Sequence, residues 1–171
     1  MSRLELAADK LECTELVTRL ARGIDRCDAD IVRDCFHPDA TDDHGMFKGT
    51  AADFVTWVMP VLDTMKRTQH VIGQCLVEVD GDTAAGEAYF VAHHTIETPD
   101  GDILMIAAGR YLDRFERRDG TWKISHRHAV YDWNSTVPCT DGWDRDDPDN
   151  PSAYGVRGSE DASYRHLALK G

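Results

Sequence analysis

Residues 69–133 read QHVIGQCLVEVDGDTAAGEAYFVAHHTIETPDGDILMIAAGRYLDRFERRDGTWKISHRHAVYDW. β-Branched and aromatic residues are frequent in four segments of this stretch, residues 69–79, 83–95, 103–117 and 121–133. An Asp-Gly pair lies in each of the three connections between these segments. Because Asp-Gly between two strand-like segments is a strong hairpin signal, the stretch predicts four consecutive antiparallel strands.

The residues before this block show helical periodicity instead. Apolar side chains recur there every three or four positions, which is the stripe of an amphipathic helix. Three helices are predicted, over residues 11–27, 30–36 and 54–65. We expect the His37-Pro38 step to end the second helix and Pro60 to kink the third. Helices followed by a block of strands are typical of the α+β class, with helices on one face of a curved antiparallel sheet.

The length of 171 residues fits one domain with an appended tail. We expect the domain to span residues 1–134. Residues 135–171 form an acidic tail that is rich in turn formers and whose aromatic residues are Trp143, Tyr154 and Tyr164. Two alternatives are open for this tail, namely disorder, or docking on the body or on a neighbouring subunit.

The charge of the chain excludes some classes of partner. Thirty-one acidic residues against 19 Lys and Arg give a formal charge of −12, which repels nucleic acid and anionic membrane surfaces. The five cysteines form no C-x-x-C pair, so we expect reduced thiols and neither a disulfide framework nor a zinc knuckle. The first residues lack the apolar segment of a signal peptide, and the expected location is the cytoplasm.

Several short strings carry a resemblance to a known family. They are GIDRCD at 23–28, CFHPDA at 35–40, TQHVIG at 68–73, GRYLDRFE at 109–116 and WKI at 122–124. In content and order they resemble the SnoaL-like branch of the nuclear-transport-factor-2-like superfamily, over about residues 5–134. The resemblance implies a cone, in which a strongly bent antiparallel sheet wraps around a long helix and leaves a pocket open at one end. Enzymes of this superfamily include scytalone dehydratase, bile-acid 7α-dehydratase, lindane dehydrochlorinase, ketosteroid isomerase and polyketide cyclases, which move protons without a redox cofactor.

The resemblance also implies a pair of catalytic residues. Asp25 and His70 stand where the dehydrochlorinase and the bile-acid dehydratase have an aspartate late in the first helix and a histidine early in the first long strand. A histidine takes up a proton near neutral pH, and a carboxylate on its far nitrogen fixes the tautomer and stabilises the imidazolium. The alternative is an exposed helix aspartate and a strand histidine with a structural role. Leu20 stands where both enzymes have Tyr or Lys, which argues against their two substrates.

Two further residues are candidates for the same pocket. Arg127 matches in register a strand arginine of those enzymes, where a guanidinium stabilises a leaving oxygen or an enolate. It shares a strand face with Tyr131 unless a bulge mixes the faces, and the alternative is a surface arginine. His93 lies 23 residues after His70, where the bile-acid dehydratase has an aspartate, and is a candidate second acid or hydroxyl anchor.

Aromatic and histidine side chains complete the expected pocket. The candidate substrate-binding residues are Phe36, Trp57, Tyr89, His128 and Tyr131, with a place in the core as the alternative for Trp57 and Tyr89. His93, His94, His126 and His128 lie on two strands, but without a recognisable carboxylate partner we expect no metal site. Asp42, Asp43 and His44 are interpreted as a pocket rim or a turn rather than as ligands.

These observations predict a cofactor-independent lyase that acts on a hydroxylated cyclic or aromatic small molecule. His70 would remove a proton, Asp25 would orient it, and Arg127 or His93 would assist the departing group. Elimination of water and carbon–carbon cleavage that releases a small aldehyde would use the same residues. The alternatives are an isomerase or cyclase of the same fold and a non-catalytic ligand-binding or partner subunit. The superfamily also implies a homo-oligomer, a dimer or trimer formed through the outer face of the sheet.

Overall fold

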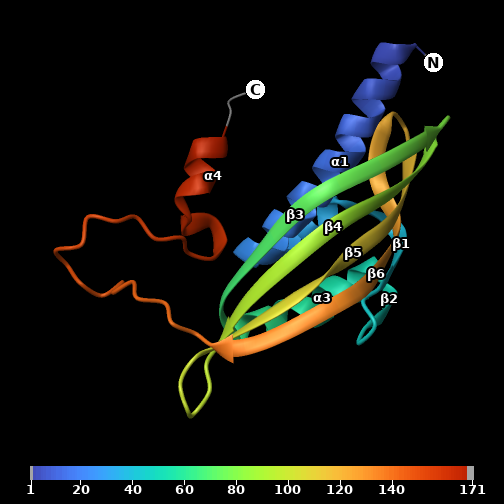
Figure 1. Cartoon of the computed structure of the whole chain (residues 1–171). Coiled ribbons are helices and arrows are strands. Elements are labelled where there is room, and N and C mark those ends of the chain that lie inside the picture. The colour runs from blue at the N-terminus through green and yellow to red at the C-terminus, as the bar shows by residue number, and fades with distance from the viewer. Residues whose placement is uncertain (1, 169–171) are drawn as a thin grey trace.

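The computed structural model describes residues 2–168. Its helices and strands are α1 (Arg3–Arg26), α2 (Ala29–Asp34), β1 (Phe36–Asp43), β2 (Lys48–Thr50), α3 (Ala51–Asp63), β3 (Met65–Asp80), β4 (Thr83–Ile96), β5 (Ile103–Arg118), β6 (Thr121–Pro138), the short η1 (Gly158–Glu160) and α4 (Ala162–Leu167). One mixed sheet has the order β2-β1-β6-β5-β4-β3, and α1 and α3 lie on its concave side (Figure 1). The predicted α+β class with helices over a curved sheet is confirmed.

The predicted meander forms the main part of the sheet. β3 to β6 pair in sequence as antiparallel neighbours. At two of the tight turns a glycine has positive φ, +60° at Gly81 and +78° at Gly120, which is the conformation that Asp-Gly hairpins require. β1 is the exception to the antiparallel pairing, since it runs parallel to β6. The long chain between these two strands permits a parallel pair.

The helix boundaries differ from those predicted. α1 begins at Arg3, eight residues before the expected start, because Ser2 and Glu5 form a capping box and the first turns consist of good helix formers. α2 ends at Asp34, and α3 ends at Asp63 although it contains Pro60. The chain is already extended at Met65, which the helical pattern had included.

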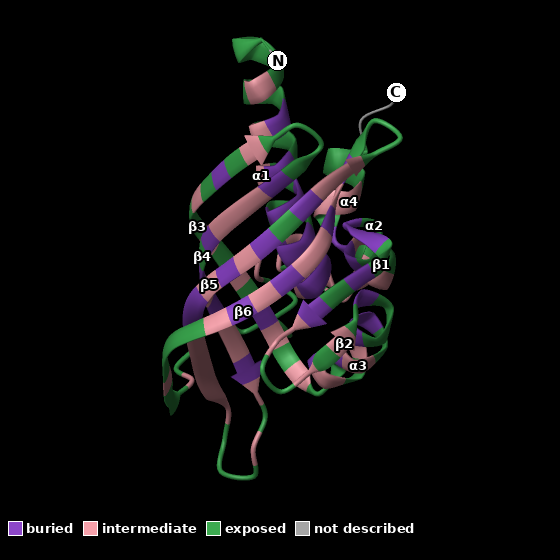
Figure 2. Ribbon diagram, turned by 90° about the vertical axis from the view of Figure 1, so that its right-hand side faces the viewer, coloured by how far each residue is buried: buried purple, intermediate pink, exposed green. Residues whose placement is uncertain are grey.

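Bulges bend the sheet. In the β5–β6 pairing, Ser125 and Asp132 are extra residues on β6, and a further irregularity lies in β3 between Ile72 and Cys75. An extra residue kinks its strand and increases the local twist. The strands therefore curve around the helices, and Figure 2 shows buried residues interspersed with more exposed ones along the strands.

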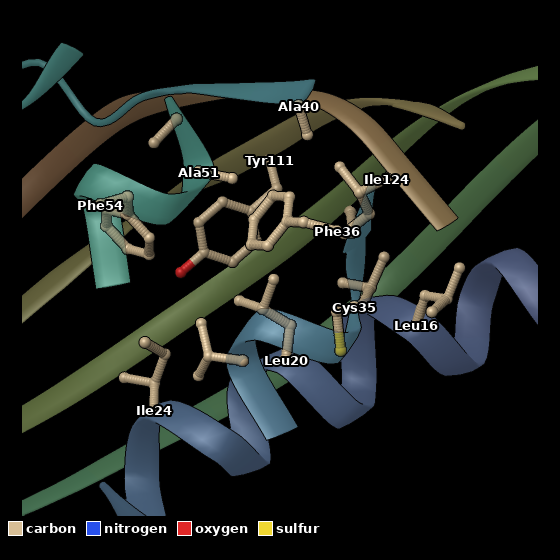
Figure 3. Packing of buried hydrophobic residues seen from close by; sticks show 14 of the residues in the cluster. Leu16, Leu20, Ile24, Cys35, Phe36, Ala40, Ala51, Phe54, Tyr111 and Ile124 are labelled. Carbon is tan, nitrogen blue, oxygen red and sulfur yellow. The ribbon is translucent and has the colours of Figure 1, made fainter. Parts of the chain in front are cut away.

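The apolar stripe of α1 supplies one wall of the core. Its buried members include Cys13, Val17, Leu20 and Ile24. They pack with side chains of the sheet and of α3, including the fully buried Phe54, as Figure 3 shows from close by. An unfilled space remains beside the last turns of α1, where Leu20 and Ile24 line a cavity.

The C-terminal segment returns to the body. After β6 the chain loops away and comes back with α4 beside the end of α1 (Figure 1). Arg26 pairs with Asp161 at 2.9 Å, and the Arg22 guanidinium lies 4.4 Å from the centroid of the Tyr164 ring. None of the helices in the described part of the chain has the length and apolar character that a membrane crossing requires.

Candidate active site

A cavity of about 640 Å³ lies between the concave face of the sheet and helices α1 and α3. Most of its wall is apolar and aromatic, with Leu20 and Ile24 from α1 and Phe54 and Trp57 from α3. Its polar side chains include three histidines, His44, His70 and His94. An apolar cavity of this size with a few converging polar groups is typical of a small-molecule site.

Asp25 and His70 meet at the edge of this cavity. Asp25 lies in the last turn of α1, and His70 lies on the neighbouring edge strand β3. The backbone N–H of His70 donates to Asp25 Oδ2 at 2.8 Å, and His70 Nδ1 lies 2.8 Å from Oδ1. Both side chains are nearly buried, and only His70 lines the cavity. The carboxylate therefore holds the imidazole from behind and directs Nε2 away from itself.

The charge state of Asp25 follows from these contacts. Burial raises the pKa of its carboxyl, but the hydrogen bonds and the charge of His70 outweigh burial, and the pKa lies below its ordinary value. An ionised Asp25 accepts from Nδ1–H, so a neutral His70 carries its lone pair on Nε2. This arrangement suits a base that takes a proton from a molecule in the cavity.

His94 lies beside this pair. Its ring meets that of His70 edge to face, with centroids 5.6 Å apart, and its Nδ1 is buried without a hydrogen-bond partner among residues 2–168. Burial, and then the charge of His70, lower the pKa of His94 to about 4. His94 is therefore neutral near pH 7, and it adds no positive charge beside the base.

His44 reaches the cavity from the loop after β1. Its Nδ1 donates to the Oδ1 of Asp42, which is only 1% exposed and lies behind it. The ring stacks on Phe54, with centroids 4.6 Å apart and planes 14° apart. The sequence analysis interpreted this segment as a pocket rim or a turn, and it gave no sign that Asp42 and His44 pair with each other.

Arg127 requires a correction. It lies on the concave side of β6, yet it is absent from the cavity wall and forms two hydrogen bonds with Asp113, at 2.8 and 2.7 Å. Asp113 is its direct partner in the β5–β6 register, so the two opposite charges neutralise each other in the core. The guanidinium lies 4.0 Å from the ring centroid of Tyr111, which does line the cavity. Arg127 thus supports a wall residue and does not reach the cavity itself.

Tyr111 is a site residue that sequence reasoning missed. Phe90 stacks on its ring at a centroid distance of 4.3 Å. Its hydroxyl points into the space between Phe54 and the α1 residues Leu20 and Ile24 (Figure 3). The only available signal was its alternation with Gly109, Asp113 and Phe115, which places these residues on one strand face.

The other expected residues divide between the cavity and other places. Trp57 and Tyr131 line the cavity. His93 points to the opposite face of β4 from His94, because successive strand residues alternate, and it faces a groove beside residues 139–157. The three residues that lie elsewhere, in the core or outside the cavity, are Phe36, Tyr89 and His128.

The histidines of the two strands do not converge. Within residues 2–168, no three His, Cys, Asp or Glu side chains form a group that could hold a metal ion. His126 bonds to Thr41 at 2.8 Å, and His128 lies 3.5 Å from Asp43. Of the four histidines on these two strands, His94 lines the cavity, and the other three are not among its lining residues.

This chain is similar in sequence and structure to several known proteins. The model of the SnoaL-like domain matches residues 5–128. An uncharacterised protein of Mycobacterium tuberculosis is 28% identical over 123 residues, which are 70% of this chain and 83% of that protein. A structure of another M. tuberculosis protein, of unknown function, is 26% identical with a TM-score of 0.65, and the match covers 77% of each chain.

Two further solved structures share the fold. The hexachlorocyclohexane dehydrochlorinase LinA-type3 from Novosphingobium barchaimii has a TM-score of 0.69 at 20% identity, over 80% of this chain and 94% of its own. A Novosphingobium aromaticivorans protein named for scytalone dehydratase has a TM-score of 0.67 at 17% identity, over 75% and 87%. These structures share the fold of this chain. Because the family model spans most of the chain, the chain belongs to the SnoaL-like domain family.

Proposed function

We propose that this protein is a cofactor-independent lyase that removes a proton from a carbon atom of a hydroxylated cyclic or aromatic molecule and expels a neighbouring group. His70 is the base and Asp25 orients it. The observation that carries the proposal is the doubly hydrogen-bonded Asp25–His70 pair at the wall of an apolar cavity. The family and the structural likeness to a dehydrochlorinase support elimination chemistry of this kind.

The steps follow from the arrangement. Apolar walls exclude water from the bound molecule, which strengthens the interaction of His70 Nε2 with a carbon-bound hydrogen. As Nε2 takes the proton, Asp25 stabilises the imidazolium that forms. A positioned base of this type contributes about 10² to 10⁴ in rate. Arg127 and His93 have no part in this proposal, because neither reaches the cavity.

The test begins with a generic probe for proton abstraction from carbon. 5-Nitrobenzisoxazole opens to a coloured phenolate when a base removes its C–H proton, and we expect saturable opening by the native protein. His70→Ala should lower kcat/KM by about 10²-fold or more, whereas the exposed His166→Gln in α4 should leave it unchanged. Activity that survives His70→Ala would overturn the assignment of the base.

An isomerase or cyclase of the same fold would share the base and return the proton to the substrate. The mass of the product separates the two reactions. A panel of hydroxylated cyclic ketones should yield products lighter by one water, or by a small aldehyde if carbon–carbon cleavage occurs. Products of unchanged mass that depend on His70 would identify an isomerase and contradict the lyase assignment.

A further inference from the structure

The cavity holds a second histidine–aspartate pair that the proposed reaction leaves without a role. His44 lines the cavity, and its Nδ1 donates to Asp42. Stacking on Phe54 and a centroid distance of 6.0 Å to Tyr111 fix the plane of its ring. Its Nε2 has no hydrogen-bond partner in the described part of the chain. An aromatic wall residue held in this way has one nitrogen available for a bound molecule.

The two carboxylates differ in how they are satisfied. Asp25 has one contact from His70 at each carboxylate oxygen, from the backbone N–H to Oδ2 and from Nδ1 to Oδ1. Asp42 receives one from His44, and its Oδ2 is buried with no partner among residues 2–168. A buried carboxylate oxygen without a partner is costly, so Asp42 depends on its single contact with His44. Asp42 therefore holds the Nδ1 side of the His44 ring and leaves Nε2 for a bound molecule.

The other charged and ionisable groups around Asp42 do not replace its contact with His44. Arg127 of β6 is the register partner of Asp42, but Asp113 of β5 already neutralises that guanidinium. Tyr111 and Tyr131 are the ionisable groups that face Asp42 from β5 and β6, and burial raises the pKa of both. They stay neutral near pH 7, and the Phe54 ring of α3 stacks on His44.

We propose that His44, held by Asp42, is the acid of this site and gives a proton to the oxygen that leaves the substrate. The inference rests on the proposed function and adds the acid that protonates the leaving group. His70 Nε2 takes the C–H proton, the electron pair of that bond forms the new double bond, and the bond to oxygen breaks with its electrons on oxygen. His44 Nε2–H protonates that oxygen, which leaves as water or an alcohol. Solvent then removes the proton from His70 and returns one to His44.

The positions of the two histidines narrow the substrate class. β1 and β3 are four strands apart in the sheet order, about 19 Å along the sheet, and only the bend brings both histidines to one cavity. The base and the acid thus approach from different sides. The substrate class that fits is a ring with an acidic C–H bond on one side and a hydroxyl, ether or ester oxygen as leaving group on the other.

The first experiment varies the leaving group. Benzisoxazoles with and without the 5-nitro group release phenolates of different basicity, and an acid matters more for the more basic one. His44→Gln and the isosteric Asp42→Asn should lower kcat/KM about 10²-fold for the unsubstituted compound but less than about threefold for the nitro compound. A merely structural role would lower both rates equally. Equal losses, or no loss for either compound, would overturn the proposal.

A binding experiment separates this proposal from the proposed function. 4-Nitrophenolate mimics the departing oxyanion, and its absorption spectrum reports its protonation and binding without turnover. We expect the native protein and His70→Ala to bind it, and His44→Gln and Asp42→Asn to bind it at least about tenfold more weakly, while His166→Gln matches the native protein. If the native protein and all variants fail to catalyse elimination but phenolate binding still depends on His44, the proposed lyase function is refuted and the proposed role of His44 is not. Phenolate affinity that is independent of His44, or no phenolate binding by the native protein, would refute the acid.

Discussion

The substitution Asp25→Asn tests how the carboxylate controls His70. Asp25 accepts two hydrogen bonds from this residue, from the backbone N–H and from Nδ1, each at 2.8 Å. An asparagine offers one acceptor oxygen and one NH₂ group. The backbone N–H is a permanent donor and requires the oxygen, so the NH₂ group must donate to Nδ1. The proton of a neutral His70 then moves to Nε2, and the nitrogen that faces the cavity can no longer accept a proton.

The expected effect on catalysis is large. Loss of the correct tautomer should lower kcat/KM for 5-nitrobenzisoxazole by about 10² to 10⁴, which corresponds to about 3–5 kcal/mol of transition-state stabilisation. The exposed Asp39→Asn is a matched control that removes a carboxylate far from the cavity and should keep native activity. A kcat/KM for Asp25→Asn within about threefold of the native value, alongside an inactive His70→Ala, would refute the tautomer argument.

The same substitution has a signature in stability. The folded pKa of Asp25 lies below its ordinary value, so its ionised form stabilises the fold above its unfolded pKa, about 4, and this contribution is lost as the pH falls through the folded value. In urea unfolding, the free energy of Asp25→Asn should lie below the native value near pH 7 by about 1–3 kcal/mol, and the gap should close in acid. A gap that widens in acid would contradict the sign of the pKa shift.

Three other predictions concern the core, the tail and the outer face. Arg127→Met should lower the free energy of unfolding by about 3–5 kcal/mol because Asp113 is left unpaired. The double variant Arg127→Met/Asp113→Leu should recover most of this loss, and a double variant that is as unstable as the single variant would contradict the prediction. Arg26→Ala should speed amide hydrogen exchange in α4 but not in β3 to β6, and unchanged exchange in α4 would refute the role of this contact. Val71 and Tyr89 are about half exposed on the outer face of the sheet, and we propose that this face forms the interface of a homo-oligomer. Tyr89→Asp should reduce the mass measured by light scattering, and a native protein that is monomeric would disprove the proposed oligomer.

The local sequence was enough to predict the class of fold. Turn chemistry is a short-range property, so the Asp-Gly connections marked the four long strands with small errors at their ends. The start of α1 was missed because a capping box stabilises its first turns without an apolar stripe. The contact between Asp25 and His70 was predicted through the family resemblance, since nothing in the 45 intervening positions indicates that the two residues meet.

What the sequence by itself determined is the alternation of strand faces, the order of the elements and the identity of the groups available for chemistry. Only the tertiary structure decided which of these groups share a cavity. Arg127 lies on the predicted side, but its register partner Asp113 takes up its charge before it can face a ligand. His44, which follows β1, shares a cavity with His70 of β3 because bulges bend the sheet between these two strands. Register and curvature depend on contacts between residues far apart in the chain, and a local pattern carries no information about them.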